Sequence, residues 1–108
     1  MKTYKIEISL FASEKILKLL GYLESEWGST SKSNFLQKLN ESILKIKSFP
    51  KSSPIYSERM KIYQCVVSRR TTIYYSISED VVQVLTLSDN RQNPKIIHEE
   101  LIALFNKQ

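Results

Sequence analysis

The chain has 108 residues, of which 42% are hydrophobic, and its formal net charge is +5 at pH 7. This length suits one domain, and without a run of about twenty apolar residues or a signal-peptide pattern we expect a cytoplasmic protein with no membrane partner. Because Cys65 is the single cysteine and His98 the single histidine, the sequence predicts no disulfide, no metal site and no cofactor.

The positive charge is concentrated in one segment, Lys45 to Arg70. This segment holds seven basic residues and one acidic residue, so its net charge of +6 exceeds that of the whole chain. Two explanations remain open. The segment is either a solvated face that keeps the protein soluble or a surface for an anionic partner, which would be nucleic acid or an acidic protein segment.

Residues 4–10 alternate between apolar and polar side chains, which predicts a strand with one buried face. A helix is expected next, with Ser13 as its cap and Gly28 at its end. The helical spacing of its apolar residues predicts one buried face, made of Ile16, Leu17, Leu20, Leu23 and Trp27.

A second helix is predicted after Gly28, capped by one of the hydroxyls of residues 29–31 and ending at Phe49-Pro50. Its apolar stripe consists of Phe35, Leu36, Leu39, Ile43 and Ile46. So short a link makes the two helices an antiparallel hairpin. Residues 50–60 are predicted to be loop, because Pro50 and Pro54 block regular structure.

The second half of the chain is rich in β-branched and aromatic residues. It predicts three strands at 62–67, 72–77 and 81–87, with breaks so short that they form an antiparallel meander. A last helix begins with Asn93 as its cap and Pro94 at its first position. Its apolar face is made of Ile97, Leu101, Leu104 and Phe105.

These elements predict an α+β fold of two layers, a helical hairpin packed on a small twisted antiparallel sheet, in the order β-α-α-β-β-β with a C-terminal helix. Trp27 and Tyr75 are expected in the core. The first strand has no hairpin partner, and its place in the sheet does not follow from the pattern.

The residue types exclude several kinds of chemistry. A hydrolytic triad has no base beside a nucleophile, and two glycines cannot build a phosphate-cradling loop. His98 is expected to be solvated on the polar side of the last helix. Cationic and aromatic side chains remain. They could bind phosphates and stack on the bases of a nucleic acid, or they could bind carboxylates of a protein. They are Lys61, Arg69, Arg70, Tyr74 and Arg91.

Two runs of the sequence carry a family resemblance. The first is CVVSRRTTIYYSI, which consists of a strand, a basic turn and a strand with paired tyrosines. The second is VVQVLTLSDNRQNPKII, which is a closing strand with a D-x-R-Q-x-P ending. The first helix ending in Trp-Gly, the early Phe of the second helix and the following SFP are similar too. In order and spacing, nearly the whole chain resembles the RelE/ParE superfamily of type II toxin-antitoxin toxins, often called plasmid stabilisation proteins. The resemblance implies a single RelE/ParE-like toxin domain over residues 1–108, with its last helix at about 94–106.

The branches of this superfamily differ in mechanism. Members that resemble RelE are ribosome-dependent ribonucleases, with basic residues on the strand before the basic turn and a His or Tyr near the end of the closing strand. In this chain Tyr63, Cys65 and Val67 stand where those basic residues would project, and Asp89 stands in place of the His. The usual catalytic set is therefore missing.

The segment SDNRQNP, residues 88–94, is interpreted first as a structural terminus. In this interpretation Arg91 pairs with Asp89 or with a nearby chain end, and Asn93-Pro94 starts the last helix. The ParE-like branch also lacks the ribonuclease residues, and its members block DNA gyrase by binding.

The departures from the ribonuclease pattern favour the ParE-like branch. The resemblance then implies a non-catalytic toxin that causes growth arrest by binding an essential enzyme such as DNA gyrase and is neutralised by a cognate antitoxin. The alternatives are a RelE-type mRNA endonuclease acting on the ribosome, with Arg69, Arg70, Tyr74 and Arg91 as its catalytic set, and an inactive toxin relic. The residues expected to bind a partner are Arg59, Lys61, Arg69, Arg70 and Arg91.

Overall fold

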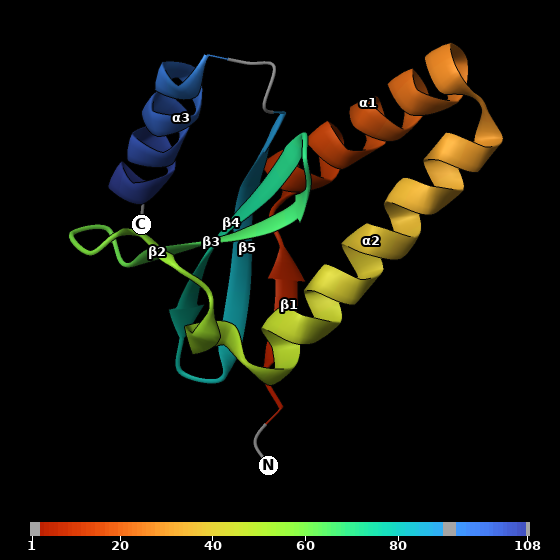
Figure 1. Cartoon of the computed structure of the whole chain (residues 1–108). Helices are drawn as coiled ribbons and strands as arrows, with labels where there is room; N and C mark the ends of the chain where they lie inside the picture. The colour runs from red at the N-terminus through yellow and green to blue at the C-terminus, as the bar shows by residue number, and fades with distance from the viewer. Residues whose placement is uncertain (1–2, 90–92, 108) are drawn as a thin grey trace.

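A β-sheet separates a helical hairpin on one face from a single helix on the other (Figure 1). The computed structural model describes residues 3–89 and 93–107. The elements, in chain order, are β1 (Lys5–Ile8), α1 (Leu10–Trp27), α2 (Ser29–Ser48), a 3-10 turn η1 (Pro50–Ser52), β2 (Ile55–Ser57), β3 (Ile62–Ser68), β4 (Thr71–Ser78), β5 (Val81–Asp89) and α3 (Pro94–Asn106). The predicted α+β class and its element order are confirmed, and none of the described helices is long and apolar enough to span a membrane.

The strands lie in the order β1-β5-β4-β3-β2. The predicted meander of β3, β4 and β5 is confirmed as antiparallel. The first strand, whose place the sequence left open, runs parallel to β5, so the sheet is mixed and not antiparallel throughout. Parallel neighbours need a long crossover, and here everything from α1 to β4 lies between them. The segment predicted as loop also contains η1 and the short strand β2, which pairs with β3.

Helix α1 begins earlier than predicted, and its cap is Ser9 rather than Ser13. The Ser9 Oγ accepts a hydrogen bond from the Ala12 N–H (3.0 Å) and donates one to the Leu85 carbonyl (2.9 Å). The second of these contacts, with the neighbouring strand β5, fixes the start of the helix. The local sequence does not reveal it, because Leu85 is remote from Ser9 along the chain.

Gly28 ends α1, as predicted, and immediately precedes α2. Its φ of 91° lies in the left-handed region, which glycine adopts without the strain a side chain would cause. The predicted hydroxyl cap at residues 29–31 is wrong, because α2 already begins at Ser29 and has no side-chain cap. One residue therefore makes the whole link of the hairpin.

The larger apolar cluster lies between the hairpin and the sheet, with Phe35, Leu39 and Ile46 of α2 packed toward Tyr75. Tyr75 is fully buried, as predicted. Trp27 and Leu17 are wrongly predicted as core, since they are 60% and 68% exposed. The outer end of the hairpin, where α1 ends at Trp27, extends past the sheet (Figure 1), and most of this side chain is therefore left exposed. The residues of α1 in this cluster are Ala12, Ile16, Leu19, Leu20 and Leu23.

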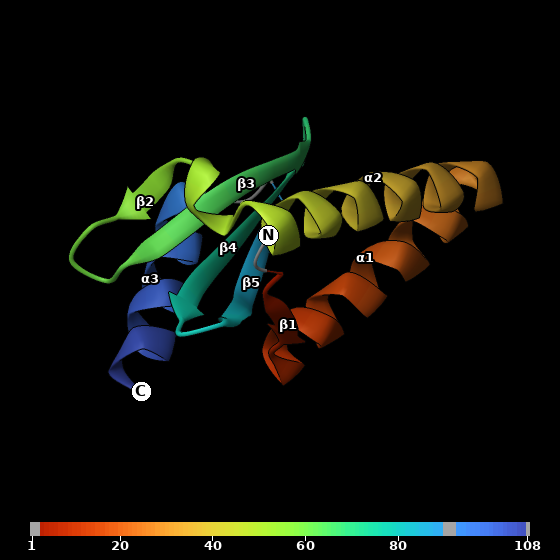
Figure 2. The same cartoon turned by 90° about the horizontal axis from the view of Figure 1, so that it is seen from below.

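Helix α3 packs on the opposite face of the sheet and adds a layer to the predicted two (Figure 2). Its start agrees with the prediction, because the Asn93 side chain accepts a hydrogen bond from the Lys95 N–H (3.0 Å) and Pro94 is the first helical residue. Ile97 and Leu101 are buried in a second cluster. The sheet side of that cluster is formed by Ile62, Tyr74 and Leu85.

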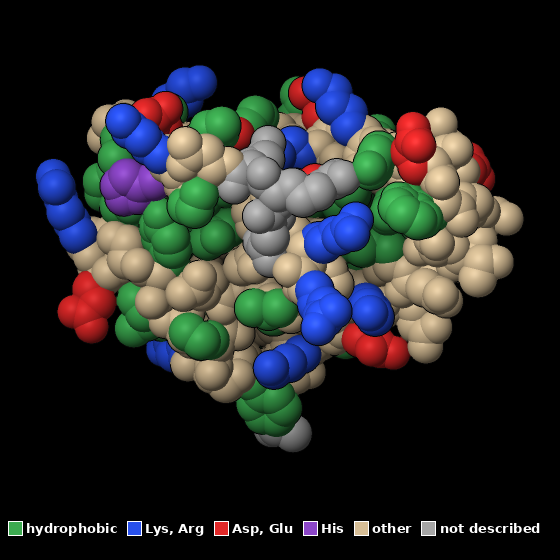
Figure 3. Space-filling model, turned by 45° about the horizontal axis from the view of Figure 1, so that its top comes forward, with side chains coloured by type: hydrophobic (Ala, Val, Ile, Leu, Met, Phe, Trp, Pro, Cys, Tyr) green, Lys and Arg blue, Asp and Glu red, His purple; other side chains and the backbone are tan. Residues whose placement is uncertain are grey.

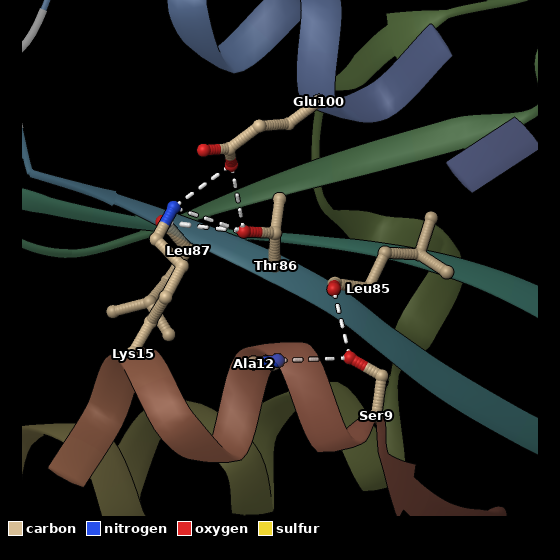
Figure 4. A network of polar contacts seen from close by, with 7 residues as sticks. All are labelled: Ser9, Ala12, Lys15, Leu85, Thr86, Leu87 and Glu100. Carbon is tan, nitrogen blue, oxygen red and sulfur yellow. Dashed lines mark hydrogen bonds and ion pairs between the residues drawn. The ribbon is translucent and has the colours of Figure 1, made fainter. Parts of the chain in front are cut away.

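A polar network joins α1, β5 and α3 (Figure 4). The Lys15 Nζ lies 2.9 Å from the Glu100 Oε1 and 3.1 Å from the Thr86 Oγ1, which is 3.2 Å from the same carboxylate oxygen. Thr86 is completely buried. The three side chains therefore satisfy one another's polar groups between α1, β5 and α3.

Candidate functional site

Arg69 and Arg70 form the two-residue turn between β3 and β4, where the sequence places them. Ser68 and Thr71 pair directly below the turn, and the Ser68 Oγ accepts a hydrogen bond from the Arg70 N–H (3.3 Å). Both arginines are exposed. Figure 3 shows Lys and Arg side chains gathered in the middle of the face that contains this end of the sheet.

A pocket of about 210 Å³ lies between this turn and the helical hairpin. Arg70 and Thr71 form its side on the sheet, with Asp89 from the end of β5. The hairpin contributes apolar and polar side chains from both helices. They are Leu19, Tyr22, Leu23, Ser31, Asn34, Phe35 and Lys38.

The charges around this pocket favour an anionic group. Lys38 and Arg70 face one acid, Asp89, and within the described part of the chain neither cation forms an ion pair. An apolar floor with cations at the rim can hold an aliphatic or aromatic side chain beside a carboxylate. Sequence reasoning missed Lys38, because only the packing of α2 on the sheet brings it next to the turn.

The other predicted partner-binding residues do not join this pocket. Arg59 and Lys61 lie in the turn between β2 and β3, at the opposite end of β3. The seven residues of β3 span about 20 Å, so the basic segment forms two separate surfaces. Arg91 lies outside the described residues, and its predicted role and its pairing with Asp89 stay predictions.

Tyr74, a residue of the alternative catalytic set, lies beneath α3. Its ring is buried and meets the ring of Tyr56 edge to face, with the centroids 5.1 Å apart. Tyr74 is four residues beyond Arg70 along β4, roughly 13 Å away. The structure therefore does not bring Tyr74 together with Arg69 and Arg70.

The positions at which the ribonuclease branch carries basic residues face the core in this chain. Cys65 and Val67 are buried and Tyr63 packs against the same cluster, so this side of β3 faces the hairpin. The alternating residues on the other side of the strand, Gln64 and Val66, are uncharged as well.

His98 is exposed, as expected, and it has a partner that the sequence did not indicate. Its Nδ1 lies 2.9 Å from the hydroxyl of Tyr56, which connects α3 to β2. Burial and, after it, the neighbouring Tyr74 raise the pKa of Tyr56. The described residues contain no group of three His, Cys, Asp or Glu that could hold a metal ion.

Comparisons with known proteins identify the fold. No family model matches the chain, and no curated protein matches its sequence. A chain of the chromosomal ParDE TA system from P. aeruginosa superposes with a TM-score of 0.70 and 10% identity, covering 81% of this chain and 96% of that one. A copper-bound mutant toxin from Helicobacter pylori superposes with a TM-score of 0.54 and 18% identity, covering 82% of this chain and 96% of that one. The chain therefore has a ParE/RelE-like toxin fold.

Proposed function

We propose that this protein is the toxin of a type II toxin-antitoxin pair, a plasmid stabilisation protein whose growth arrest is relieved by a cognate antitoxin. The observation that carries this proposal is the fold shared with a chain of a ParDE TA system over most of both chains. The order of elements and the resemblance of the two sequence runs support the same proposal.

The mode of action that we propose is binding without catalysis, with an essential enzyme such as DNA gyrase as the target. Support comes from β3 and β4, the strands on which a ribonuclease of this fold would carry its catalytic side chains. Cys65 and Val67 are buried under the hairpin and Tyr74 is buried under α3. A cleavage mechanism requires cations and a proton-transfer group at one phosphate, and these strands do not offer such a set.

The antitoxin contact that we propose is the pocket beside the β3–β4 turn. Lys38, Arg69 and Arg70 give this surface a positive charge that suits an acidic antitoxin segment. The nearby apolar floor would bury one side chain of that segment, and such a buried anchor contributes more to affinity than exposed ion pairs do.

Induction of the chain in a sensitive bacterium tests the proposed function. We expect growth arrest, relieved when the reading frame next to its gene is induced at the same time. The matched control carries the same plasmid with an early stop codon. Normal growth despite confirmed accumulation of folded protein would contradict the proposal and indicate an inactive relic.

A second experiment separates binding from cleavage. Purified protein added to programmed ribosomes should leave the messenger intact. Cleavage in the ribosomal A site that is lost in Tyr74→Phe and in Arg70→Ala would instead establish the ribosome-dependent endonuclease as the function.

A further inference from the structure

A second hollow, of about 460 Å³, lies at the end of the sheet away from the β3–β4 turn. Its floor is apolar and consists of Ile55 of β2, Tyr63 of β3 and Ile77 of β4. Tyr63 pairs with Ile55 on one side and with Tyr75 on the other, and Ile77 follows two residues after Tyr75, so the three floor residues point to one face. Ile55 is 49% exposed. The hollow is in the size range of small-molecule sites.

Four charged side chains surround this floor, two of each sign. The cations are Lys51 of η1 and Lys61, and the anions are Glu58 and Glu79. All four are exposed, and within the described part of the chain none of them forms an ion pair. The rim therefore offers both a positive and a negative group to a ligand while its own charges cancel.

Two of the charged residues on the rim have a strained backbone. Lys61 and Glu79 have φ angles of 56° and 55°, and they are the non-glycine residues of the described chain that lie in the left-handed region. Lys61 ends the turn between β2 and β3, and Glu79 begins the two-residue turn between β4 and β5. Glycine and asparagine suit such positions in hairpin turns, so a long charged side chain there reduces stability.

Strain and charge coincide at this hollow. The two turns belong to different hairpins, yet each has a charged residue where the turn favours glycine, and the two charges are of opposite sign. Within the described residues, neither Lys61 nor Glu79 forms an ion pair or belongs to an apolar cluster, so these side chains do not support the fold through such contacts. Backbone strain of this kind gathers at functional sites, where the side chain is needed for binding.

We propose that this hollow binds a small zwitterion with an apolar body, either a free amino acid with a large apolar side chain or a short peptide of such residues. Its carboxylate contacts Lys61, its ammonium group contacts Glu79, and its apolar body covers Tyr63 and Ile77. Charges of both signs on the rim and an apolar floor match these three parts of the ligand. The proposal does not rest on the proposed toxin function, because neither the antitoxin contact nor growth arrest enters it.

Titration of the full chain with small probes, followed by NMR, tests the hollow. The probes are L-phenylalanine and the dipeptide leucyl-phenylalanine. The control is N-acetyl-L-phenylalanine amide, which keeps the apolar body and removes both charges. We expect a probe to shift the amide resonances around Tyr63, Ile77 and Glu79, and the control to bind at least about tenfold more weakly. Tighter binding of L-phenylalanine would identify a free amino acid as the ligand, and tighter binding of the dipeptide a short peptide.

Variants in the two turns separate binding from stability. Lys61→Gly and Glu79→Gly each remove one charge and relieve the left-handed strain, so they should weaken binding at least about threefold while the melting temperature does not fall. Arg59→Gln is the matched control, because it removes an exposed cation of the same turn that does not line the hollow. Its affinity for the probe should stay within about 1.5-fold of the unmodified chain.

Several results would overturn the proposal. They are the absence of shifts with both probes, shifts centred on another surface, and equal binding of the uncharged control. A fall in the melting temperature of both glycine variants would do the same, since it would assign the two side chains to the fold. Shifts at the hollow that depend on protein concentration without a probe would mean that a second copy of this chain occupies it. Growth arrest is measured separately, so the toxin function can stand while the zwitterion site fails, and the reverse.

Discussion

Tyr75 connects the sheet to the segment that follows the hairpin. Its ring is fully buried, stacks on the ring of Tyr63 with centroids 5.5 Å apart, and its hydroxyl donates to the Pro50 carbonyl (2.7 Å). The contact spans 25 residues of sequence. It satisfies a buried carbonyl just after α2, where η1 begins and the helical hydrogen bonds have ended.

Removal of this hydroxyl should destabilise the fold. Tyr75→Phe leaves the Pro50 carbonyl unpaired, so we expect the free energy of unfolding to fall by about 1–3 kcal/mol and the melting temperature by roughly 5–15 °C. Thermal unfolding followed by circular dichroism measures this. Tyr63→Phe is the matched control, because within the described residues its hydroxyl has no hydrogen bond, and its melting temperature should change by less than about 2 °C.

The stability of the protein should also depend on the ionisation of Tyr75. Burial is the largest cause of the raised pKa of this phenol; Cys65 and Tyr63 raise the pKa further and a hydrogen bond with Ser53 lowers it. The unfolded phenol ionises near pH 10, so the stabilisation is fully present below that pH and is lost as the pH rises through the folded pKa. Urea unfolding between pH 8 and about 11 should show a steeper decline for the unmodified protein than for Tyr75→Phe. Parallel declines would contradict this expectation.

At the scale of elements, the start of α1 depends on a contact that is remote in sequence. Ser9 caps the helix and also holds the Leu85 carbonyl of β5, 76 residues away. We expect Ser9→Ala to lower the free energy of unfolding by about 1–2 kcal/mol. Ser13→Ala, at the position that the sequence suggests for the cap, should change it by less than about 0.5 kcal/mol. Equal losses in chemical unfolding would mean that Ser9 does not fix the helix.

Helix α3 has two sides that differ in burial. Leu101 is completely buried against the sheet, whereas the adjacent Ile102 is 40% exposed. Leu101→Ala should therefore cost about 2–5 kcal/mol, and Ile102→Ala less than about 1 kcal/mol. Chemical unfolding of both variants, with hydrogen exchange of the α3 amides, checks this. Rapid exchange in α3 of the unmodified chain would show that the helix does not stay docked.

Local patterns predicted the elements well, because apolar spacing and caps act over a few residues. The meander, the end of α1 at Gly28 and the start of α3 at Asn93-Pro94 are of this kind. Tertiary contacts decided the rest. The alternating pattern of a strand does not specify its neighbour, so the parallel pairing of β1 with β5 was not predictable. Trp27 was wrongly predicted as buried, because it continues the apolar stripe of α1 at the end of the helix, where there is no sheet beneath it. The candidate site was not predictable for the same reason, because only the packing of α2 on the sheet places Lys38 and Arg70 around one pocket.

At the scale of the whole molecule, the sheet determines which surfaces remain available. The hairpin covers one face, α3 covers part of the other, and the turns at the two ends of β3 carry the basic residues. The two turns carry equal numbers of basic residues but have different surroundings. Arg69 and Arg70 lie beside a pocket whose sheet side includes Asp89, whereas Arg59 and Lys61 lie with Glu58 in a turn near a second hollow that also contains Glu79.

The end with Arg69 and Arg70 should therefore dominate the encounter with an acidic antitoxin. We expect the reversal of both arginines to Glu to slow association at least about tenfold at low salt, because complementary charge steers the encounter. Most of the difference should disappear near 0.5 M salt, where the Debye length is roughly 4 Å. Reversal of Arg59 and Lys61 to Glu makes the same change in net charge about 20 Å away and should slow association less than about threefold. Surface plasmon resonance across a salt series measures all three proteins, and equal slowing by the two double variants would assign the steering to total charge rather than to this end of the sheet.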